Sequence, residues 1–252
     1  MIGIFDSGIG GLTVVRELFA KSPHASFVYL GDTARTPYGN KTVSAIRAYA
    51  REDADFLVSH GATSIVIACN TVSANAADVV RDAYPNIPVY EVIVPAVDDA
   101  LAATRGCVGV IGTRATIGSG KYQSLLSVRL DLKVIAQSCP LFVPLAEEGW
   151  FDGPATDAVI ASYLEPLRSQ GVDTLILGCT HYPLLKKSIQ RFMGPDVRLI
   201  DSAESVVSRL VADGLADDGE QTYFFTDLAQ HSQAVAEQWL ERKLVIQKGT
   251  LS

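Results

Sequence analysis

The sequence SIVIAC occupies Ser64–Cys69, and a similar run, TLILGC, occupies Thr174–Cys179. Short runs rich in Val, Ile and Leu are typical of strands that are buried on both faces of a parallel sheet. Each cysteine then falls at the carboxyl end of its strand. A lone cysteine most often packs as a small hydrophobic residue, but two in matched contexts favour function. Because ligands of open α/β sheets bind outside these strand ends, we expect Cys69 and Cys179 to form two halves of one site.

The two cysteine runs belong to a longer repeated pattern. Ile2–Phe5 reads as a strand and leads through a glycine-rich turn into an expected helix at Leu12–Ala20, and Cys107–Gly112 leads into a similar turn. Asp6 and Asp32 are 26 residues apart, as are Thr113 and Cys139. The distances from Asp6 to Cys69 and from Thr113 to Cys179 are 63 and 66 residues. This spacing indicates a duplication of βα units.

The duplication predicts an α/β fold with two pseudo-symmetric parallel-sheet domains and an active site in the cleft between them. We expect residues 1–96 and 207–252 to form the first domain and residues 97–206 the second. The remaining strands are expected at Ser26–Gly31, Val89–Val94, Lys133–Gln137, Val197–Asp201 and Tyr223–Thr226, and the remaining helices at Thr42–Ser59, Val72–Tyr84, Pro183–Phe192, Ala203–Leu215 and Gln230–Glu241.

Several shorter segments are expected to lie outside these elements. Pro95 should mark a break, Glu147-Glu148-Gly149 a loop and Asp213–Glu220 a solvated acidic loop. Periodicity assigns no element to Leu244–Ser252 and leaves open where the last strand and helix dock.

Composition excludes several classes of function. The chain has 252 residues, 48% of them hydrophobic, and its 21 basic and 28 acidic residues give a net charge of −7 without a Lys/Arg-rich run. This balance argues against nucleic acid as a partner. No apolar stretch reaches about 18 residues, and the chain starts on Met1–Asp6 without a charged leader. We therefore expect no membrane partner and a cytoplasmic protein.

The four cysteines lie far apart, which predicts reduced thiols and not a disulfide framework. Neither a C-x-x-C nor an H-x-x-x-H pair occurs, and the only close pair of a cysteine and a histidine is Cys179-Thr180-His181. A structural metal is therefore not expected.

Two thiols across one crevice can invert a stereocentre. One thiolate removes a proton from one face of a substrate carbon, and the opposite thiol returns a proton to the other face. His181 and Asp6 are the candidates for exchanging protons with the thiols. The charge of Asp6 would raise the pKa of a neighbouring thiol, so we assign Asp6 a base-assisting role. Each supporting residue also has a structural interpretation: a polar neighbour for His181, caps for Asp6 and Asp32, and a solvated pair for Glu147 and Glu148.

Longer motifs resemble a known family. They are DSGIGGLTV at Asp6–Val14, GDTARTPYG at Gly31–Gly39, ACNT at Ala68–Thr71, GVIGTRATIGS at Gly109–Ser119, CPLFVPLAEEG at Cys139–Gly149, LGCTHYPLL at Leu177–Leu185 and LIDSA at Leu199–Ala203. Together they resemble the cofactor-independent glutamate racemases over nearly the whole chain.

This resemblance implies that glutamate is the small-molecule substrate, that no pyridoxal phosphate or metal is needed as cofactor, and that D-glutamate is supplied for peptidoglycan. It also suggests a homodimer. By the family pattern, Cys69 takes the α-proton of D-glutamate and Cys179 that of L-glutamate. Residues that match assisting positions are Asp6, Asp32, Glu148 and His181. Residues expected to contact the ligand are Asp6, Ser7, Pro37, Tyr38, Gly39, Asn70, Thr71, Thr113, Thr116, Thr180 and His181 together with the two cysteines.

Three other functions compete with this interpretation. The nearest is a related racemase of the aspartate or hydantoin type. A binding or inhibitory protein could keep the cleft without catalysis, although the intact cysteines argue against it. A pyridoxal-phosphate racemase needs a Schiff-base lysine, and none of the eight lysines lies in a supporting motif.

Overall fold

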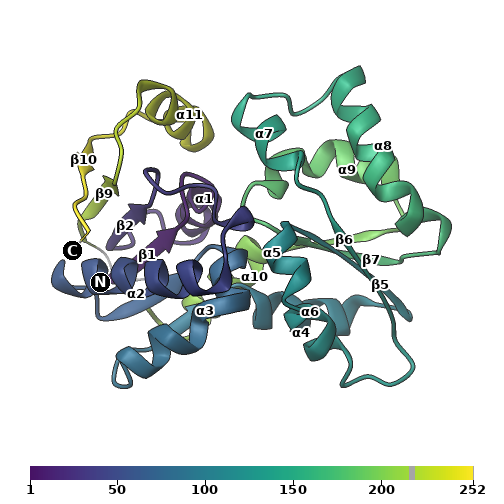
Figure 1. Ribbon diagram of the computed structural model, residues 1–252, viewed down its shortest axis with the longest axis horizontal. Helices are drawn as coiled ribbons and strands as arrows, with labels where there is room; N and C mark the ends of the chain where they lie inside the picture. The colour runs from purple at the N-terminus through teal and green to yellow at the C-terminus, as the bar shows by residue number, and fades with distance from the viewer. Residues whose placement is uncertain (216–218, 252) are drawn as a thin grey trace.

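The computed structural model describes residues 1–215 and 219–251, which form two parallel sheets flanked by helices (Figure 1). The predicted α/β class with two parallel sheets is confirmed. All strand pairings found in either sheet are parallel. Figure 1 shows the sheets side by side, with both chain termini beside the first.

The first sheet has the strand order β10-β9-β2-β1-β3-β4. Its strands are β1 (Ile2–Asp6), β2 (Phe27–Gly31), β3 (Ser64–Ile67), β4 (Val89–Glu91), β9 (Gln221–Phe225) and β10 (Ile246–Lys248). One face packs against α1 (Leu12–Lys21), α10 (Ser202–Ala212) and α11 (Gln230–Leu240), and the other against α2 (Val43–Ser59) and α3 (Asn70–Ala83). Because side chains alternate along a strand, Ile4 faces the first group of helices and Phe5 the second.

The second sheet has the order β6-β5-β7-β8. Its strands are β5 (Cys107–Gly112), β6 (Lys133–Ser138), β7 (Thr174–Gly178) and β8 (Arg198–Asp201). One face packs against α4 (Ile93–Ala103) and α6 (Lys121–Leu126), and the other against α7 (Phe142–Glu147), α8 (Pro154–Ser169) and α9 (Lys186–Met193). Three short helices lie near the strand ends: η1 (Tyr38–Asn40), α5 (Arg114–Gly118) and η2 (Tyr182–Leu185).

The strand order shows the duplication directly. The sequence β2-β1-β3-β4 in the first sheet recurs as β6-β5-β7-β8 in the second, with each strand replaced by its counterpart in chain order. Under this correspondence β3 matches β7, and Cys69 and Cys179 follow them. The predicted pseudo-symmetry is therefore confirmed.

Helices α4 and α10 connect the two sheets in the chain. The predicted domain boundaries, after residues 96 and 206, fall inside these two helices. Ala96 packs into the core of the second sheet, whereas Ala203 and Val206 pack into the core of the first. The proposed division of the chain at these residues stays a prediction.

The segment at Pro95 differs from the expectation. The expected strand at Val89–Val94 ends at Glu91, and Pro95 lies in the first turn of α4 and does not break the chain there. Proline is tolerated in a first turn because the N–H groups there have no intrahelical partner. The Glu91 carboxylate accepts from two of these first-turn amides instead, at 2.6 Å from Ile93 N and 2.9 Å from Val94 N.

Other differences concern short elements. Helices α4, α5, α6, α7 and α8 were not predicted, and Glu147 ends α7 where a loop was expected. The C-terminal segment forms β10, which pairs with β9 and so docks on the first sheet. The expected acidic loop at Asp213–Glu220 lies partly outside the described residues.

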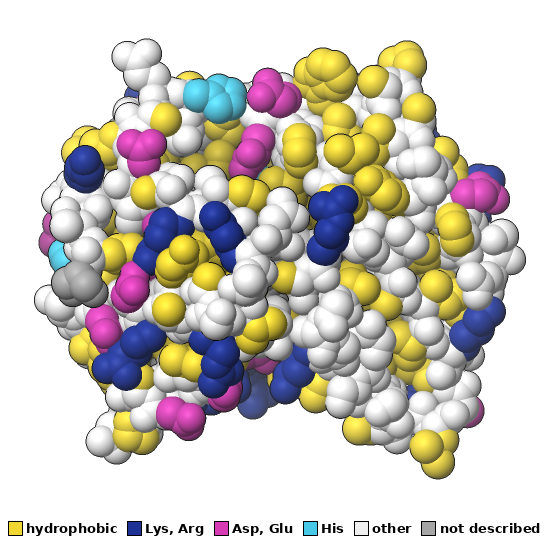
Figure 2. Space-filling model, viewed as in Figure 1, with side chains coloured by type: hydrophobic (Ala, Val, Ile, Leu, Met, Phe, Trp, Pro, Cys, Tyr) yellow, Lys and Arg dark blue, Asp and Glu magenta, His cyan; other side chains and the backbone are white. Residues whose placement is uncertain are grey.

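The surface carries charges of both signs. On the face in Figure 2, Lys and Arg side chains are scattered among acidic and apolar ones. None of the helices formed by residues 1–215 and 219–251 combines the length and apolar content needed to cross a bilayer.

Candidate active site

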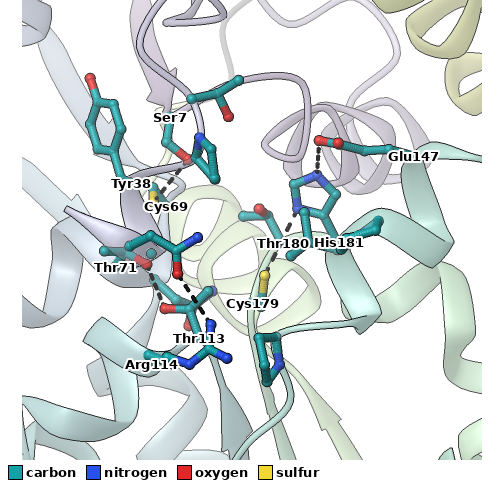
Figure 3. A pocket seen from close by; sticks show the side chains of 18 residues that line it. Ser7, Tyr38, Cys69, Thr71, Thr113, Arg114, Glu147, Cys179, Thr180 and His181 are labelled. Carbon is teal, nitrogen blue, oxygen red and sulfur yellow. Dashed lines mark hydrogen bonds and ion pairs between the residues drawn. The ribbon is translucent and has the colours of Figure 1, made fainter. Parts of the chain in front are cut away.

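A cavity of about 170 Å³ lies where the carboxyl ends of the two sheets face each other (Figure 3). Cys69 lines it from the first sheet and Cys179 from the second, and each cysteine is 5% exposed. The cavity is lined by Ser7, Thr36, Pro37, Tyr38, Gly39, Asn40, Cys69, Asn70, Thr71, Thr113, Arg114, Pro140, Val143, Pro144, Glu147, Cys179, Thr180 and His181. The expected meeting of the two strand ends is thus observed.

Cys69 lies at the amino-terminal cap of α3, directly after β3. Its Sγ is 3.5 Å from Ser7 Oγ, which comes from the glycine-rich turn after β1. Burial, followed by the charge of Asp6, raises the pKa of the Cys69 thiol to about 12. At neutral pH without substrate, Cys69 therefore carries its proton and can act as a donor.

Cys179 has a different environment. Its Sγ is 3.8 Å from Nδ1 of His181, and Nε2 of the same ring is 3.1 Å from Glu147 Oε1. Burial opposes protonation of His181, yet its contacts with Cys179 and Glu147 raise the imidazole pKa to about 10. Because an ionised Glu147 only accepts, Nε2 donates to it, and the remaining mobile proton lies between Nδ1 and the sulfur. This contact can transfer a proton to or from Cys179.

The acidic side chain in contact with His181 is that of Glu147 and not that of Glu148. Glu148 was expected to assist, but its exposed side chain lines a separate hollow with Leu141 and Trp150. Glu147 reaches His181 because adjacent helical residues point about 100° apart, so that only one of the pair at the end of α7 faces the cavity. Although burial alone would raise it, the hydrogen bond and charge of His181 lower the pKa of Glu147.

Asp6 is fully buried and does not line the cavity itself. Its Oδ2 accepts from Gly8 N at 3.1 Å, and its Oδ1 accepts from Thr180 Oγ1 of the second sheet at 3.4 Å. Burial raises the pKa of Asp6, against the lowering effect of His181 and of the backbone amides. Asp6 therefore lies between the surroundings of the two cysteines and orders Thr180.

Hydroxyl and amide groups form the wall between the cysteines. Thr71 Oγ1 is 2.9 Å from Thr113 Oγ1 and 3.2 Å from the hydroxyl of Thr116, a residue buried behind the lining. Asn70 accepts from Tyr122 Oη at 2.7 Å and donates to Ser202 Oγ at 3.3 Å. Residues of α6 and α10 thus hold the start of α3 next to Cys69.

Asp32, also expected to assist catalysis, lies behind the wall formed by Tyr38. It is fully buried and accepts from Tyr38 Oη, from Arg35 Nε at 2.5 Å and from Thr226 Oγ1 at 2.8 Å. These contacts place Asp32 against the Tyr38 hydroxyl and outside the cavity lining.

Most of the expected site is brought together. Of the expected residues, only Asp6, Asp32, Thr116 and Glu148 are absent from the cavity lining among the described residues, and the first three lie directly behind it. Lining residues that were not expected are Thr36, Asn40, Arg114, Pro140, Val143, Pro144 and Glu147. Asn40 directly follows one of the quoted motifs and the other six lie within them, which was the available signal.

The arrangement allows proton transfer at two faces of one small molecule. No group of three or more His, Cys, Asp or Glu in residues 1–215 and 219–251 is arranged as a metal site. A substrate carbon between the sulfur atoms would meet the protonated Cys69 on one side and the Cys179–His181 pair on the other.

The chain is similar in sequence and in structure to known proteins. The Asp/Glu/Hydantoin racemase family matches residues 13–210. The glutamate racemase of Chlorobaculum tepidum is 51% identical over 210 residues, which cover 82% of this chain and 77% of the relative. That of Geobacter metallireducens is 44% identical over 254 residues, covering 96% and 93%. The crystal structure of Francisella tularensis glutamate racemase in complex with D-glutamate matches with a TM-score of 0.90 and 36% identity, over 99% of this chain and 97% of that one.

Proposed function

The chain belongs to the Asp/Glu/Hydantoin racemase family, and we propose that it interconverts L- and D-glutamate by proton transfer between two cysteines. The observation that carries the proposal is the pair of buried thiols that face one cavity from equivalent strand ends. We propose that neither metal nor organic cofactor takes part.

In the direction from L- to D-glutamate, the Cys179 thiolate removes the α-proton, and the electron pair stays on the α-carbon. The Cys69 thiol then gives its proton to the opposite face. Cys179 ends protonated and Cys69 ends as a thiolate, so the reverse reaction starts from that state. His181 then takes the proton from the Cys179 thiol across the 3.8 Å contact and restores the thiolate, while Glu147 holds the imidazole in place. Asp6, near Cys69, assists on the other face.

Substrate recognition is assigned to the polar wall. Ser7, Asn70, Thr71, Thr113 and Thr180 present hydroxyl and amide donors to the cavity. The Pro37-Tyr38-Gly39 segment also lines the cavity, with Gly39 against Thr113, and is proposed to receive the distal carboxylate. A related racemase acting on aspartate or a hydantoin remains the alternative. Removing one methylene would leave buried donors unpaired, so glutamate is expected to be preferred strongly over aspartate.

The cellular role follows from the same proposal. We propose that the enzyme supplies D-glutamate for peptidoglycan, that it is cytoplasmic and that it is a homodimer. Rescue of a D-glutamate auxotroph tests the first statement, and light scattering of the purified protein tests the last.

The decisive experiment is circular dichroism of L- and D-glutamate incubated with chelator-treated enzyme, with L- and D-aspartate as controls. Both glutamate enantiomers should lose optical activity at undiminished rate, and in D₂O the α-position should gain deuterium. Restoration of activity only by a divalent ion or pyridoxal phosphate would refute the two-thiol mechanism. Equal turnover of aspartate would assign the protein to the alternative.

A further inference from the structure

The hydroxyl of Tyr38 lies between two buried carboxyl groups behind the cavity wall. Tyr38, Asp32 and Asp53 are each 0% exposed. Tyr38 Oη contacts Asp32 Oδ2 and is 3.1 Å from Asp53 Oδ2. Asp53 comes from α2 and has no part in the proton transfers described above. Its contact with a cavity-lining tyrosine therefore needs its own explanation.

The number of hydrogens available between Tyr38 and the two carboxyl groups limits how the Tyr38–Asp53 contact can form. A tyrosine hydroxyl has one hydrogen to donate, and ionised carboxylates only accept. Asp32 already accepts from Arg35 Nε and Thr226 Oγ1, the pattern of an ionised carboxylate, so it is the acceptor for the Tyr38 hydrogen. Nothing on Tyr38 is then left to fill the contact with Asp53. Two carboxylates cannot both be satisfied by one hydrogen.

We infer that Asp53 is protonated in the folded protein and donates from Oδ2 to Tyr38 Oη, acting as a positioning residue for the Tyr38–Gly39 side of the cavity. The other oxygen fits this assignment, because Asp53 Oδ1 accepts from Arg35 Nη2 at 3.2 Å as a carbonyl oxygen would. One chain of hydrogen bonds then runs from Asp53 to Tyr38 to Asp32, with every contact filled.

The charges that face Asp53 support the same state. Burial, and next the charge of Asp32, raise the pKa of Asp53 well above its ordinary range, with a smaller raising effect from Glu52. Arg35 and the Tyr38 contact oppose them, but the Arg35 cation also contacts Asp32 and Glu52. A neutral Asp53 leaves one guanidinium facing two carboxylates instead of three.

The inference predicts how two substitutions differ. Asp53→Asn keeps a carbonyl oxygen for Arg35 and places an N–H donor toward Tyr38, whereas Asp53→Ala removes both. Under the proposed function, Asp53→Ala should raise KM for glutamate about tenfold with a smaller change in kcat, and Asp53→Asn should restore KM to within about threefold. Asp32→Asn should show no such rescue, because Asp32 acts as a carboxylate. Loss in Asp53→Asn equal to that in Asp53→Ala, in folded protein, would overturn the inference.

Two readouts do not depend on activity, so they separate this inference from the proposed function. The infrared difference spectrum of wild type minus Asp53→Asn at neutral pH should contain the carbonyl band of a protonated carboxylic acid. Absence of the band would overturn the inference. Asp78→Asn, on the exposed face of α3, is the matched control and should give a difference spectrum without that band.

Urea unfolding against pH gives the second readout. The folded protein retains a proton that the unfolded chain loses above the ordinary Asp pKa of 3.8. Stability of the wild type should therefore fall relative to Asp53→Asn as pH rises above about 4, by about tenfold in the unfolding constant per pH unit, until the folded-state pKa is passed. A ratio that is independent of pH, or a trend of opposite sign, would mean that Asp53 is ionised.

Discussion

At the scale of single residues, the two halves of the site share a scaffold but differ in chemistry. Cys69 contacts a hydroxyl, Ser7, and lies near the buried Asp6, whereas Cys179 contacts an imidazole held by Glu147. Equivalent strand ends place the sulfur atoms, and their polar neighbours differ. Under the proposed mechanism, the protonated Cys69 is the donor in the direction from L- to D-glutamate.

The assignment of one thiol to each face can be tested with a substrate analogue that carries a leaving group on the β-carbon. One deprotonation then suffices for elimination, so each thiol can be assayed alone. Cys69→Ser should eliminate from the L-analogue and Cys179→Ser from the D-analogue, and each should fail with the other enantiomer. Both variants should lose racemisation, since a serine hydroxyl holds its proton far more tightly than a thiol. A swapped pattern would reverse the assignment, and equal loss in both would reject it.

The role of Glu147 can be separated from that of its neighbour by two matched substitutions. Glu147→Gln removes the charge that helps raise the pKa of His181 to about 10, so that pKa should fall. Because a base with a raised pKa stays protonated up to that pKa, the alkaline limb of the pH–rate profile should move to lower pH, with kcat reduced about 10²-fold. Glu148 is exposed and lies one residue later, so Glu148→Gln should change neither the pH–rate profile nor kcat. Equal effects of the two substitutions on the profile would contradict the geometry.

The positions of the two cysteines could be predicted from the sequence, but the residues that support them could be predicted less well. A cysteine that follows a buried strand of a parallel sheet lies at the carboxyl-end edge of that sheet, so Cys69 and Cys179 could be placed from the sequence pattern alone. Choosing between Glu147 and Glu148 needs the phase of a six-residue helix, which periodicity does not resolve. Asp53 sits in an ordinary helical pattern, and its contact with Tyr38 depends on how α2 packs beside η1. Such contacts arise from tertiary packing and leave no local signal.

At the scale of elements, most long periodic segments were predictable, whereas α4, α8 and the short helices were not. The buried strands β1, β3, β5 and β7 follow from runs of apolar residues, and α2 follows from its 17-residue periodicity. Helices α5, α6 and α7 have five or six residues each, too few for a period of 3.6 to show. Helix α8 has 16 residues, but Pro154 and Pro166 near its ends obscured it.

The close approach of η1 to α5 is expected to set the width of the cavity. A Cβ added at Gly39 would lie 2.8 Å from Thr113 Cβ, so Gly39→Ala should push η1 outward and raise KM for glutamate about tenfold. Gly118→Ala in α5 is the control, because a Cβ there meets nothing within 4 Å. That variant should keep its KM and gain about 0.5–1 kcal/mol in the free energy of unfolding. Steady-state kinetics with urea titrations would decide, and an unchanged KM in Gly39→Ala would count against this contact.

At the scale of the whole molecule, polar contacts between the two sheets surround the cavity. Thr13 Oγ1 is 2.9 Å from Thr180 O, and Tyr122 Oη donates to Asn70 in the other half. Helices α4 and α10 connect the halves in sequence. We propose that each sheet with its helices is a domain, but that these contacts and shared helices make the two unfold together.

Cooperative unfolding can be tested with the two tryptophans of the chain. In a Trp150→Phe background, fluorescence reports Trp239 in the core of the first sheet, while far-ultraviolet circular dichroism reports both sheets. Tyr122→Phe, in the second half, leaves the buried Asn70 oxygen without its donor and should cost about 1–3 kcal/mol. If the halves form one unit, both signals should move together to lower urea concentration. If the Trp239 transition stays in place while circular dichroism gains an earlier phase, the halves unfold separately, and the coupling across the cavity is weaker than these contacts indicate.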